Sequence, residues 1–120
     1  MSYERGEIYY VQRGYCFGSE QHSGRPAIIV SADVSNRYSN TVEVVYLTTQ
    51  PKKDMPTHVH IEATGRPSTA LCEQVHTVDA RRLGHQYGRC SRAEMQEIDK
   101  ALKVSLDLGE KRCLLCGASL

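Results

Sequence analysis

The sequence predicts a compact, mostly antiparallel β-barrel with one helix packed on it. Three observations support this fold class: short runs rich in β-branched and aromatic residues, glycine- and proline-rich breaks between them, and one amphipathic segment near the C-terminus. The chain has 120 residues, of which 40% are hydrophobic and 24% charged, so it suits one globular domain with a modest core. We do not expect a second domain.

The first half of the chain contains three predicted strands. Residues 7–12 form a β-rich run, which is followed by a long glycine-rich loop of the kind that is often functional in small domains. The second strand covers residues 26–32, and its first residue is a proline, which has no backbone donor and suits that position. Residues 33–40 predict a turn-rich connection, and residues 41–48 predict the third strand.

The second half begins with a break in regular structure, because residues 50–56 contain two prolines and three charged residues. Residues 57–62 then alternate strictly, which predicts a strand with one face buried and one face exposed to water. Four more segments follow, in order a turn, a strand, a helical turn and a short final strand: residues 65–67, 68–75, 78–83 and 86–90.

One helix is predicted, and it begins at Ser91. Ser91 and Glu94 form a capping-box pattern. Apolar residues then recur at helical spacing until Gly109, namely Met95, Ile98, Leu102 and Ser105 or Leu106. We expect the folded domain to span residues 1–109 and residues 110–120 to be a mobile tail outside the core fold.

Charge, cysteine content and hydropathy exclude several classes of protein. The formal net charge of +1 excludes a general polyanion binder, so any nucleic-acid site must be a local patch. Five cysteines at irregular spacing are not the disulfide framework of a secreted protein. No apolar run is long enough to span a bilayer, and the N-terminus lacks a hydrophobic signal region, so we expect a cytoplasmic protein without membrane contact.

Arg25 lies at the start of the second predicted strand, directly before Pro26. Gly24 allows the chain to turn sharply at this point. A permanently charged, forked donor at the rim of a rigid sheet suits a phosphate group. A solvated arginine that closes a strand is the alternative, so further residues are needed before Arg25 indicates catalysis.

Short motifs follow one another over most of the chain. They are Arg-Gly-Glu-Ile-Tyr at residues 5–9, Gly-Ser-Glu-Gln at 18–21, Gly-Arg-Pro-Ala-Ile-Ile-Val-Ser at 24–31, Leu-Thr-Thr-Gln at 47–50, Pro-Thr-His-Val at 56–59 and Leu-Cys-Glu-Gln-Val-His-Thr-Val-Asp at 71–79. In this order and spacing they resemble the MazF/PemK (Kid) family of bacterial toxin endoribonucleases. The resemblance runs from about residue 5 to residue 108.

The resemblance implies an SH3-like or CcdB-like antiparallel barrel, a homodimer, cleavage of single-stranded RNA such as mRNA without a metal or other cofactor, and a cognate antitoxin protein. The family's arginine at the start of the second strand matches Arg25, and its threonine at the end of the third matches Thr48, which implies that both are catalytic. Positions that line the family's RNA groove match Ser19, Glu20, Gln21, Ser68 and Gln74. The different acidic and basic pair of some Kid-type relatives has no match here.

The chemistry of RNA cleavage fits these assignments. RNA carries its own nucleophile, the 2′-hydroxyl, so an enzyme needs to align it, stabilise the charge of the transition state and move two protons. This scheme predicts 2′,3′-cyclic phosphate and 5′-hydroxyl ends and no cleavage of DNA. Arg25 would stabilise the phosphate charge first and act as a general acid second, while Thr48 would position the phosphate. The sequence does not identify the general base.

Several other residues leave alternatives open. The ring of Phe17 suits stacking on an RNA base, and it suits equally well pinning the glycine-rich loop to the barrel. His58 and His60 share one face of an alternating strand, where exposure to water is favoured over a metal pair. Cys113 and Cys116 have the spacing of a zinc or redox motif, but no second pair lies nearby, which favours a reduced tail.

A toxin without catalytic activity is the second class of function. The CcdB gyrase poison has the same kind of barrel, and a fold alone does not choose between poisoning an enzyme and cutting RNA. Such a protein would not need an arginine and a threonine in a groove. The match of Arg25 and Thr48 therefore favours the nuclease.

Overall fold

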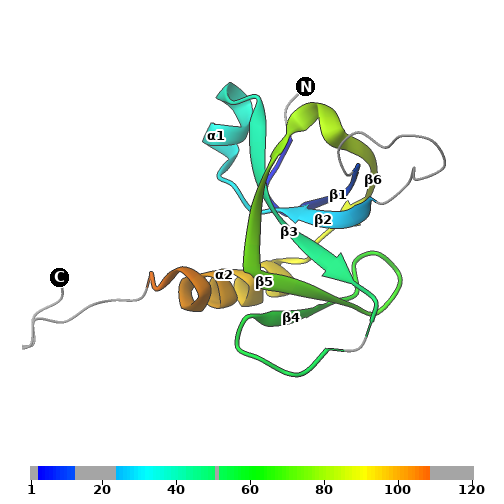
Figure 1. Ribbon diagram of the computed structural model, residues 1–120, viewed down its shortest axis with the longest axis vertical. Helices are drawn as coiled ribbons and strands as arrows, with labels where there is room; N and C mark the ends of the chain where they lie inside the picture. The colour runs from blue at the N-terminus through cyan, green and yellow to red at the C-terminus, as the bar shows by residue number, and fades with distance from the viewer. Residues whose placement is uncertain (1–2, 13–23, 51, 109–120) are drawn as a thin grey trace, which may run out of the picture.

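The computed structural model describes residues 3–12, 24–50 and 52–108. Within these residues the elements are, in chain order, β1 (Glu7–Val11), β2 (Arg25–Ile29), α1 (Asp33–Tyr38), β3 (Thr41–Thr48), β4 (His58–Ile61), β5 (Ser68–Asp79), the 3₁₀ turn η1 (Ala80–Arg82), β6 (Leu83–Arg89) and α2 (Arg92–Leu106). The strands of this part of the chain form one sheet in the order β4-β5-β3-β2-β1-β6, and every pair is antiparallel (Figure 1).

The sheet curls because β5 is irregular in its middle. Between Val45 and Leu47 of β3, the paired residue in β5 changes from Val75 to Ala70, so β5 carries extra residues there and bends. At the far edge, β6 approaches the turn after β4, where a Cβ on Gly88 would lie 2.8 Å from the carbonyl oxygen of Ala63. The two edges of the sheet therefore come together. The predicted class, a mostly β barrel-like domain with a C-terminal helix, is confirmed.

Two apolar clusters fill the two faces of the curved sheet. Because side chains alternate between faces along a strand, neighbouring residues of β2 belong to different clusters, Ile28 to one and Ala27 and Ile29 to the other. The first cluster lies between the sheet and α2, which packs against β4 and β5, as Figure 1 shows. The second cluster lies on the opposite face, and its members are Val11, Ala27, Ile29, Val42, Val44 and Val78.

The predicted start of the C-terminal helix is confirmed in detail. Glu94 donates its backbone N–H to Ser91 Oγ at 3.1 Å, and Ser91 donates its own to Glu94 Oε1 at 2.8 Å, which completes the capping box. Ile98, Ala101 and Leu102 then form the buried side of the helix. α2 ends at Leu106, and Asp107 follows in the left-handed region with φ 55°.

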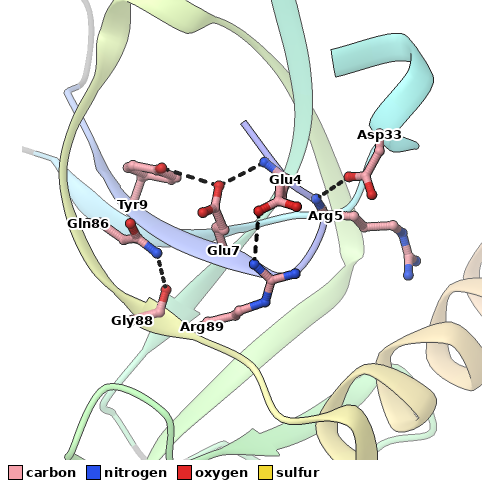
Figure 2. Close-up of polar contacts among 8 residues, drawn as sticks. All are labelled: Glu4, Arg5, Glu7, Tyr9, Asp33, Gln86, Gly88 and Arg89. Carbon is pink, nitrogen blue, oxygen red and sulfur yellow. Dashed lines mark hydrogen bonds and ion pairs between the residues drawn. The ribbon is translucent and has the colours of Figure 1, made fainter. Parts of the chain in front are cut away.

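The N-terminal segment holds distant elements together through polar contacts (Figure 2). The backbone N–H of Arg5 donates to Asp33 Oδ1 at 2.6 Å, which connects this segment to α1. Arg89 of β6 donates to Glu4 Oε1 at 3.2 Å. Burial and the neighbouring carboxylate of Glu7 raise the pKa of Tyr9 to about 12, so its hydroxyl stays protonated and donates to Glu7 Oε1 at 3.2 Å.

Several predicted boundaries are wrong. The second strand ends at Ile29 instead of residue 32, because its pairing with β3 ends there. The prediction of a turn-rich connection at residues 33–40 fails because most of them form α1, whose first residue, Asp33, accepts a hydrogen bond from the distant Arg5 backbone N–H. β5 continues past residue 75 because its pairing with β3 extends to Asp79. β6 begins at Leu83 instead of residue 86 because its pairing with β1 starts there.

The remaining expectations about domain organisation stay predictions. The expected tail, residues 110–120, lies outside the described residues. In the described ranges, no helix is long and apolar enough to cross a membrane.

Candidate active site

A cavity of about 400 Å³ opens where β2 begins and β3 ends. Arg25, Thr48 and Ser68 all line it, so the structure brings together three of the residues that the sequence analysis selected. The cavity is also lined by residues from β1, from β6 and from the turn between β4 and β5. It therefore lies over one end of the curled sheet.

Strand register explains why Arg25 and Thr48 meet although they are far apart in the sequence. Ala27 of β2 pairs with Tyr46 of β3, and continuing this antiparallel register by two residues sets Arg25 opposite Thr48. Thr48 in turn pairs with Thr69 of β5. Directly opposite residues in a sheet share a face, so their side chains reach the same cavity.

Arg25 is half-buried and contacts an aromatic ring. Its guanidinium carbon lies 5.3 Å from the ring centroid of Tyr46, which makes an edge contact with His76 at a centroid distance of 4.9 Å. Among the described residues, no aspartate or glutamate forms an ion pair with Arg25. The ring holds the cation in place without neutralising it, so the charge remains available to an anion in the cavity.

The chain approaches Arg25 through a close contact at Gly24. The backbone N–H of Gly24 donates to the Tyr10 hydroxyl at 3.1 Å. A Cβ on Gly24 would lie 2.4 Å from the Val11 carbonyl oxygen and 2.5 Å from the Tyr10 ring. Only glycine permits this approach, which sets the position from which Arg25 enters the cavity.

The two hydroxyl groups in the cavity differ in what they can offer a ligand. Thr48 Oγ1 accepts a hydrogen bond from the Gln50 backbone N–H at 3.2 Å, so its own O–H remains able to donate. Ser68 is buried, and its hydroxyl donates to the Arg66 carbonyl at 3.1 Å. Thr48 is therefore the better donor to a phosphate oxygen, whereas Ser68 can accept a hydrogen bond from a ligand and remains a predicted RNA contact.

Gln74 lies on the other side of Arg25. It lines a second hollow of about 280 Å³ together with Arg25, Tyr46, His76 and Arg82. Gln74 is exposed and belongs to the irregular part of β5. Arg25 thus separates a cavity that contains Thr48 from a hollow that contains Gln74.

The other predicted RNA-binding residues cannot be placed relative to this cavity. Phe17, Ser19, Glu20 and Gln21 all lie within residues 13–23, which are outside the described residues. Cys113 lies outside them as well, as does the rest of its motif.

Sequence reasoning missed several lining residues of these hollows, among them Tyr10, Tyr46, Arg66 and Tyr87. A signal existed for Tyr46, because it precedes Thr48 by two residues on the same strand and so shares its face. No local signal pointed to Tyr87, because its strand was expected to be short and was given no function.

The histidine pair of β4 is not a metal site in the described part of the chain. His58 forms an ion pair with Glu73 at 3.0 Å and contacts the Lys53 carbonyl at 2.7 Å, while His60 is exposed and 3.7 Å from Asp54. In that part of the chain, no group of three or more His, Cys, Asp and Glu side chains is placed to hold a metal. Thr57, Val59 and Ile61 on the other face are buried, as the alternation predicts.

Arginine at a cavity suits phosphate groups, and in the described part of the chain Arg25 has no carboxylate partner and shares its cavity with the Thr48 hydroxyl. The curled antiparallel sheet with a C-terminal helix supplies the scaffold. The fold and the site together define a small barrel-like protein with an arginine-lined cavity at one end of its sheet.

Comparisons with known proteins identify the family. The model of the PemK-like, MazF-like toxins of type II toxin–antitoxin systems matches residues 4–106. Endoribonuclease EndoA of Bacillus subtilis (strain 168) is 36% identical over 113 residues, which cover 90% of this chain and 97% of the relative. The chain therefore belongs to the PemK-like, MazF-like toxin family, as its motifs predicted.

Solved structures agree with this assignment. An endoribonuclease from mycobacterial species, in complex with its cognate antitoxin, matches with a TM-score of 0.78 and 26% identity, covering 92% of this chain and all (100%) of that one. MazF from Deinococcus radiodurans matches with a TM-score of 0.73 at 21% identity over 89% of this chain and 98% of that one, which supports the fold.

Proposed function

We propose that this chain is a metal-independent, sequence-selective endoribonuclease toxin that cleaves single-stranded RNA. The observation that carries the proposal is the placement of Arg25, which has no carboxylate partner among the described residues, opposite Thr48 in one cavity. Membership of a family with a relative named endoribonuclease EndoA supports the reaction. The alternative of a CcdB-like gyrase poison is not favoured, because it would leave this pair of residues without a role.

In the proposed reaction the 2′-hydroxyl of the RNA attacks the adjacent phosphorus, and the 5′-oxygen of the next nucleotide leaves. The 2′-oxygen to phosphorus bond forms as the bond to the 5′-oxygen breaks. The 2′-hydroxyl loses its proton to a general base, and the departing 5′-oxygen takes up a proton from a general acid, a second role for Arg25, which gives a 2′,3′-cyclic phosphate and a 5′-hydroxyl. Arg25 stabilises the negative charge that grows on the non-bridging oxygens. Thr48 donates its hydroxyl hydrogen to the same phosphate and holds it in line for attack.

RNA outside the scissile phosphate would bind on both sides of Arg25. Gln74 has an exposed amide in the second hollow, where it can pair with the edge of an unstacked base. Ser68 shapes the wall of the main cavity. Phe17 and the motif at residues 19–21 remain predicted RNA contacts.

The family also suggests the partners. We propose that the chain acts in the cytoplasm as a homodimer and is neutralised by a cognate antitoxin protein. The mycobacterial relative was solved in complex with its cognate antitoxin, which supports a partner of this kind. Light scattering of the purified protein, alone and with the product of a neighbouring gene, would test both assemblies.

Cleavage of a long mixed-sequence RNA in the presence of EDTA tests the proposed function. We expect cuts at a short recurring sequence, cyclic phosphate ends, and no cut where the scissile nucleotide carries a 2′-deoxy sugar. Thr48→Val should lower kcat by about 10- to 100-fold, while Thr48→Ser keeps the hydroxyl and most of the activity. The proposal fails if wild-type protein leaves every long RNA intact, or if Thr48→Val cuts as fast as wild type.

A further inference from the structure

One wall of the main cavity is aromatic, and the proposed reaction does not use it. Tyr10 of β1 and Tyr87 of β6 both line the cavity that contains Arg25 and Thr48. Their ring centroids are 6.4 Å apart. His85, two residues before Tyr87 on the same strand, completes a cluster of three rings.

The three rings contact one another in the order Tyr10, His85, Tyr87. Tyr10 is anchored at its hydroxyl, which accepts the backbone N–H of Gly24 at 3.1 Å. The His85 ring stacks on Tyr10 at a centroid distance of 5.8 Å with an angle of 7° between the planes. Tyr87 contacts His85 at 4.5 Å with an angle of 52°. Two rings therefore back Tyr87, which restricts the orientations that it can adopt.

Core packing does not account for this cluster. None of its rings belongs to either apolar cluster of the sheet, and both His85 and Tyr87 are exposed, Tyr87 to 41% of its full area. A large exposed ring costs little when isolated, but three rings in mutual contact, beside an arginine that forms no ion pair with any described carboxylate, form a surface suited to a flat, anionic ligand.

We propose that Tyr87, backed by His85 and Tyr10, is a stacking platform for the unpaired base of a nucleotide next to the phosphate that Arg25 binds. This inference rests on the proposed function. Successive bases of single-stranded nucleic acid stack on aromatic side chains, while a cation beside them holds the backbone. The cavity offers both groups within about 400 Å³, a size suited to one small ligand.

Stacking on a ring gives affinity with little preference between bases, because every base has a π-face. Tyr87 is therefore expected to strengthen RNA binding at one position of the cleavage site without choosing the base there. Choice of base would come from hydrogen-bonding groups elsewhere, such as Gln74 in the second hollow.

The test measures binding of an RNA oligonucleotide that carries the mapped cleavage site, with a 2′-deoxy sugar at the scissile nucleotide to prevent cleavage. Fluorescence anisotropy gives Kd for wild type, Tyr87→Leu, Tyr87→Phe and the control Tyr38→Leu, which alters an exposed tyrosine on α1 outside the cavity. We expect Tyr87→Leu to weaken binding by roughly 10-fold, because the base loses its stacking partner, and the other two variants to bind like wild type.

Abasic substitutions, made one at a time along the oligonucleotide, assign the effect to a position. At one nucleotide beside the scissile phosphate, loss of the base should weaken RNA binding by the wild-type protein roughly 10-fold. The same loss should hardly change RNA binding by Tyr87→Leu. The fluorescence of a 2-aminopurine base at that position should be quenched when the wild-type protein binds and should not be quenched when Tyr87→Leu binds. Circular dichroism melts confirm that the variant is folded, and His85→Ala, which removes the backing ring, should weaken binding at the same position.

Equal loss in wild type and Tyr87→Leu at every abasic position would overturn the inference, as would wild-type affinity of Tyr87→Leu for the intact oligonucleotide. Either result leaves the endoribonuclease assignment standing if wild type still cuts RNA in EDTA. Wild type that neither binds nor cuts the RNA would overturn the proposed function and this inference together.

Discussion

Arg5 and Arg25 are both half-buried arginines beside strands of the same sheet, but their surroundings differ. Arg5 lies under α2, where its Nε donates to the Val30 carbonyl at 2.8 Å and its Nη2 pairs with Asp99 Oδ1 at 2.7 Å. Arg25 lies at the cavity, where its guanidinium contacts the Tyr46 ring and no carboxylate among the described residues. The donors of Arg5 are used to join parts of the fold, whereas the described residues leave the Arg25 charge available to a ligand.

The same difference separates two regions of the sheet. At the face covered by α2, the helix has a complete capping box and buries Ile98 fully against the apolar cluster of the sheet. At the cavity, polar and aromatic side chains meet around open space, and Thr48 keeps a hydrogen to donate. Changes at the helix-covered face should alter stability, and changes at the cavity should alter activity.

The largest expected effect is the loss of activity in Arg25→Ala. Removing one preorganised donor to a developing anionic charge lowers kcat by about 10²- to 10³-fold. Arg25→Lys should rescue little, because a single ammonium cannot replace a planar fork. Single-turnover cleavage of a defined RNA measures both variants, and Arg89→Ala, at an exposed arginine that pairs with Glu4, is the control. A melting temperature of Arg25→Ala far below that of wild type would show instead that Arg25 mainly stabilises the fold.

Arg5→Gln should show the opposite pattern. It removes a charged hydrogen bond to Asp99 and the contact with the Val30 carbonyl, which should cost about 1–2 kcal/mol in the free energy of unfolding, since Asp99 is 46% exposed and partly solvated. Urea unfolding measures this loss, and RNA cleavage of the folded variant should match wild type. Loss of kcat at full stability would contradict the contrast between the two arginines.

Ser91→Ala tests the helix end with a smaller change. Removing the side chain that accepts the Glu94 backbone N–H should lower the free energy of unfolding by about 1 kcal/mol and leave RNA cleavage unchanged. Ser91→Asp, which keeps an acceptor at this position, should retain most of the stability that Ser91→Ala loses. Thermal melts of the three proteins give the comparison, and equal stability of Ser91→Ala and wild type would show that the helix does not depend on its cap.

The smallest expected effect is a change in the pH dependence of stability at the His58–Glu73 pair. Burial opposes the charged form of each group. The hydrogen bond between the two groups, together with a backbone hydrogen bond to each of them, outweighs the effect of burial. The pKa of His58 is therefore raised, and the pKa of Glu73 is lowered. The His58 contribution is complete below its unfolded pKa of 6.5 and is lost as pH rises through the folded value. The Glu73 contribution is complete above 4.5 and is lost as pH falls through its folded value.

The pair should therefore stabilise the fold most between pH 4.5 and 6.5. Glu73→Gln should lower the free energy of unfolding in that interval by about 0.5–1 kcal/mol, with a smaller difference at pH 9. Chemical unfolding at a series of pH values measures this. A difference between the two proteins that does not vary with pH would rule out a charge effect. RNA cleavage should not change, because neither residue lines the cavity.

Local patterns in the sequence were sufficient for much of the fold. β-Branched runs located the strands, with β3 predicted at its observed bounds of Thr41–Thr48. The pair Ser91 and Glu94 located the start of α2, because a capping box involves residues only three positions apart. The position of Arg25 at a strand entrance also followed from its immediate neighbours, Gly24 and Pro26.

The site itself required tertiary structure. Thr48 faces Arg25 because of the register of β2 against β3, and a register between strands is a long-range property that no single segment contains. The short helix α1 is joined to the N-terminal segment by the hydrogen bond from the Arg5 backbone to Asp33, and the bend of β5 depends on its change of partner residues in β3. The aromatic wall likewise forms only when β1 and β6, at opposite ends of the domain sequence, lie side by side.

The sequence by itself thus determined which segments become strands and the C-terminal helix, the family to which they belong, and which arginine and threonine to examine. Only the tertiary structure decided that the Arg25 guanidinium contacts the Tyr46 ring, that Gln74 lies in a separate hollow, and that Tyr87 borders the cavity. The physical reason is that secondary structure follows from neighbours along the chain, whereas charge compensation and cavity walls depend on residues that meet only after the sheet has curled.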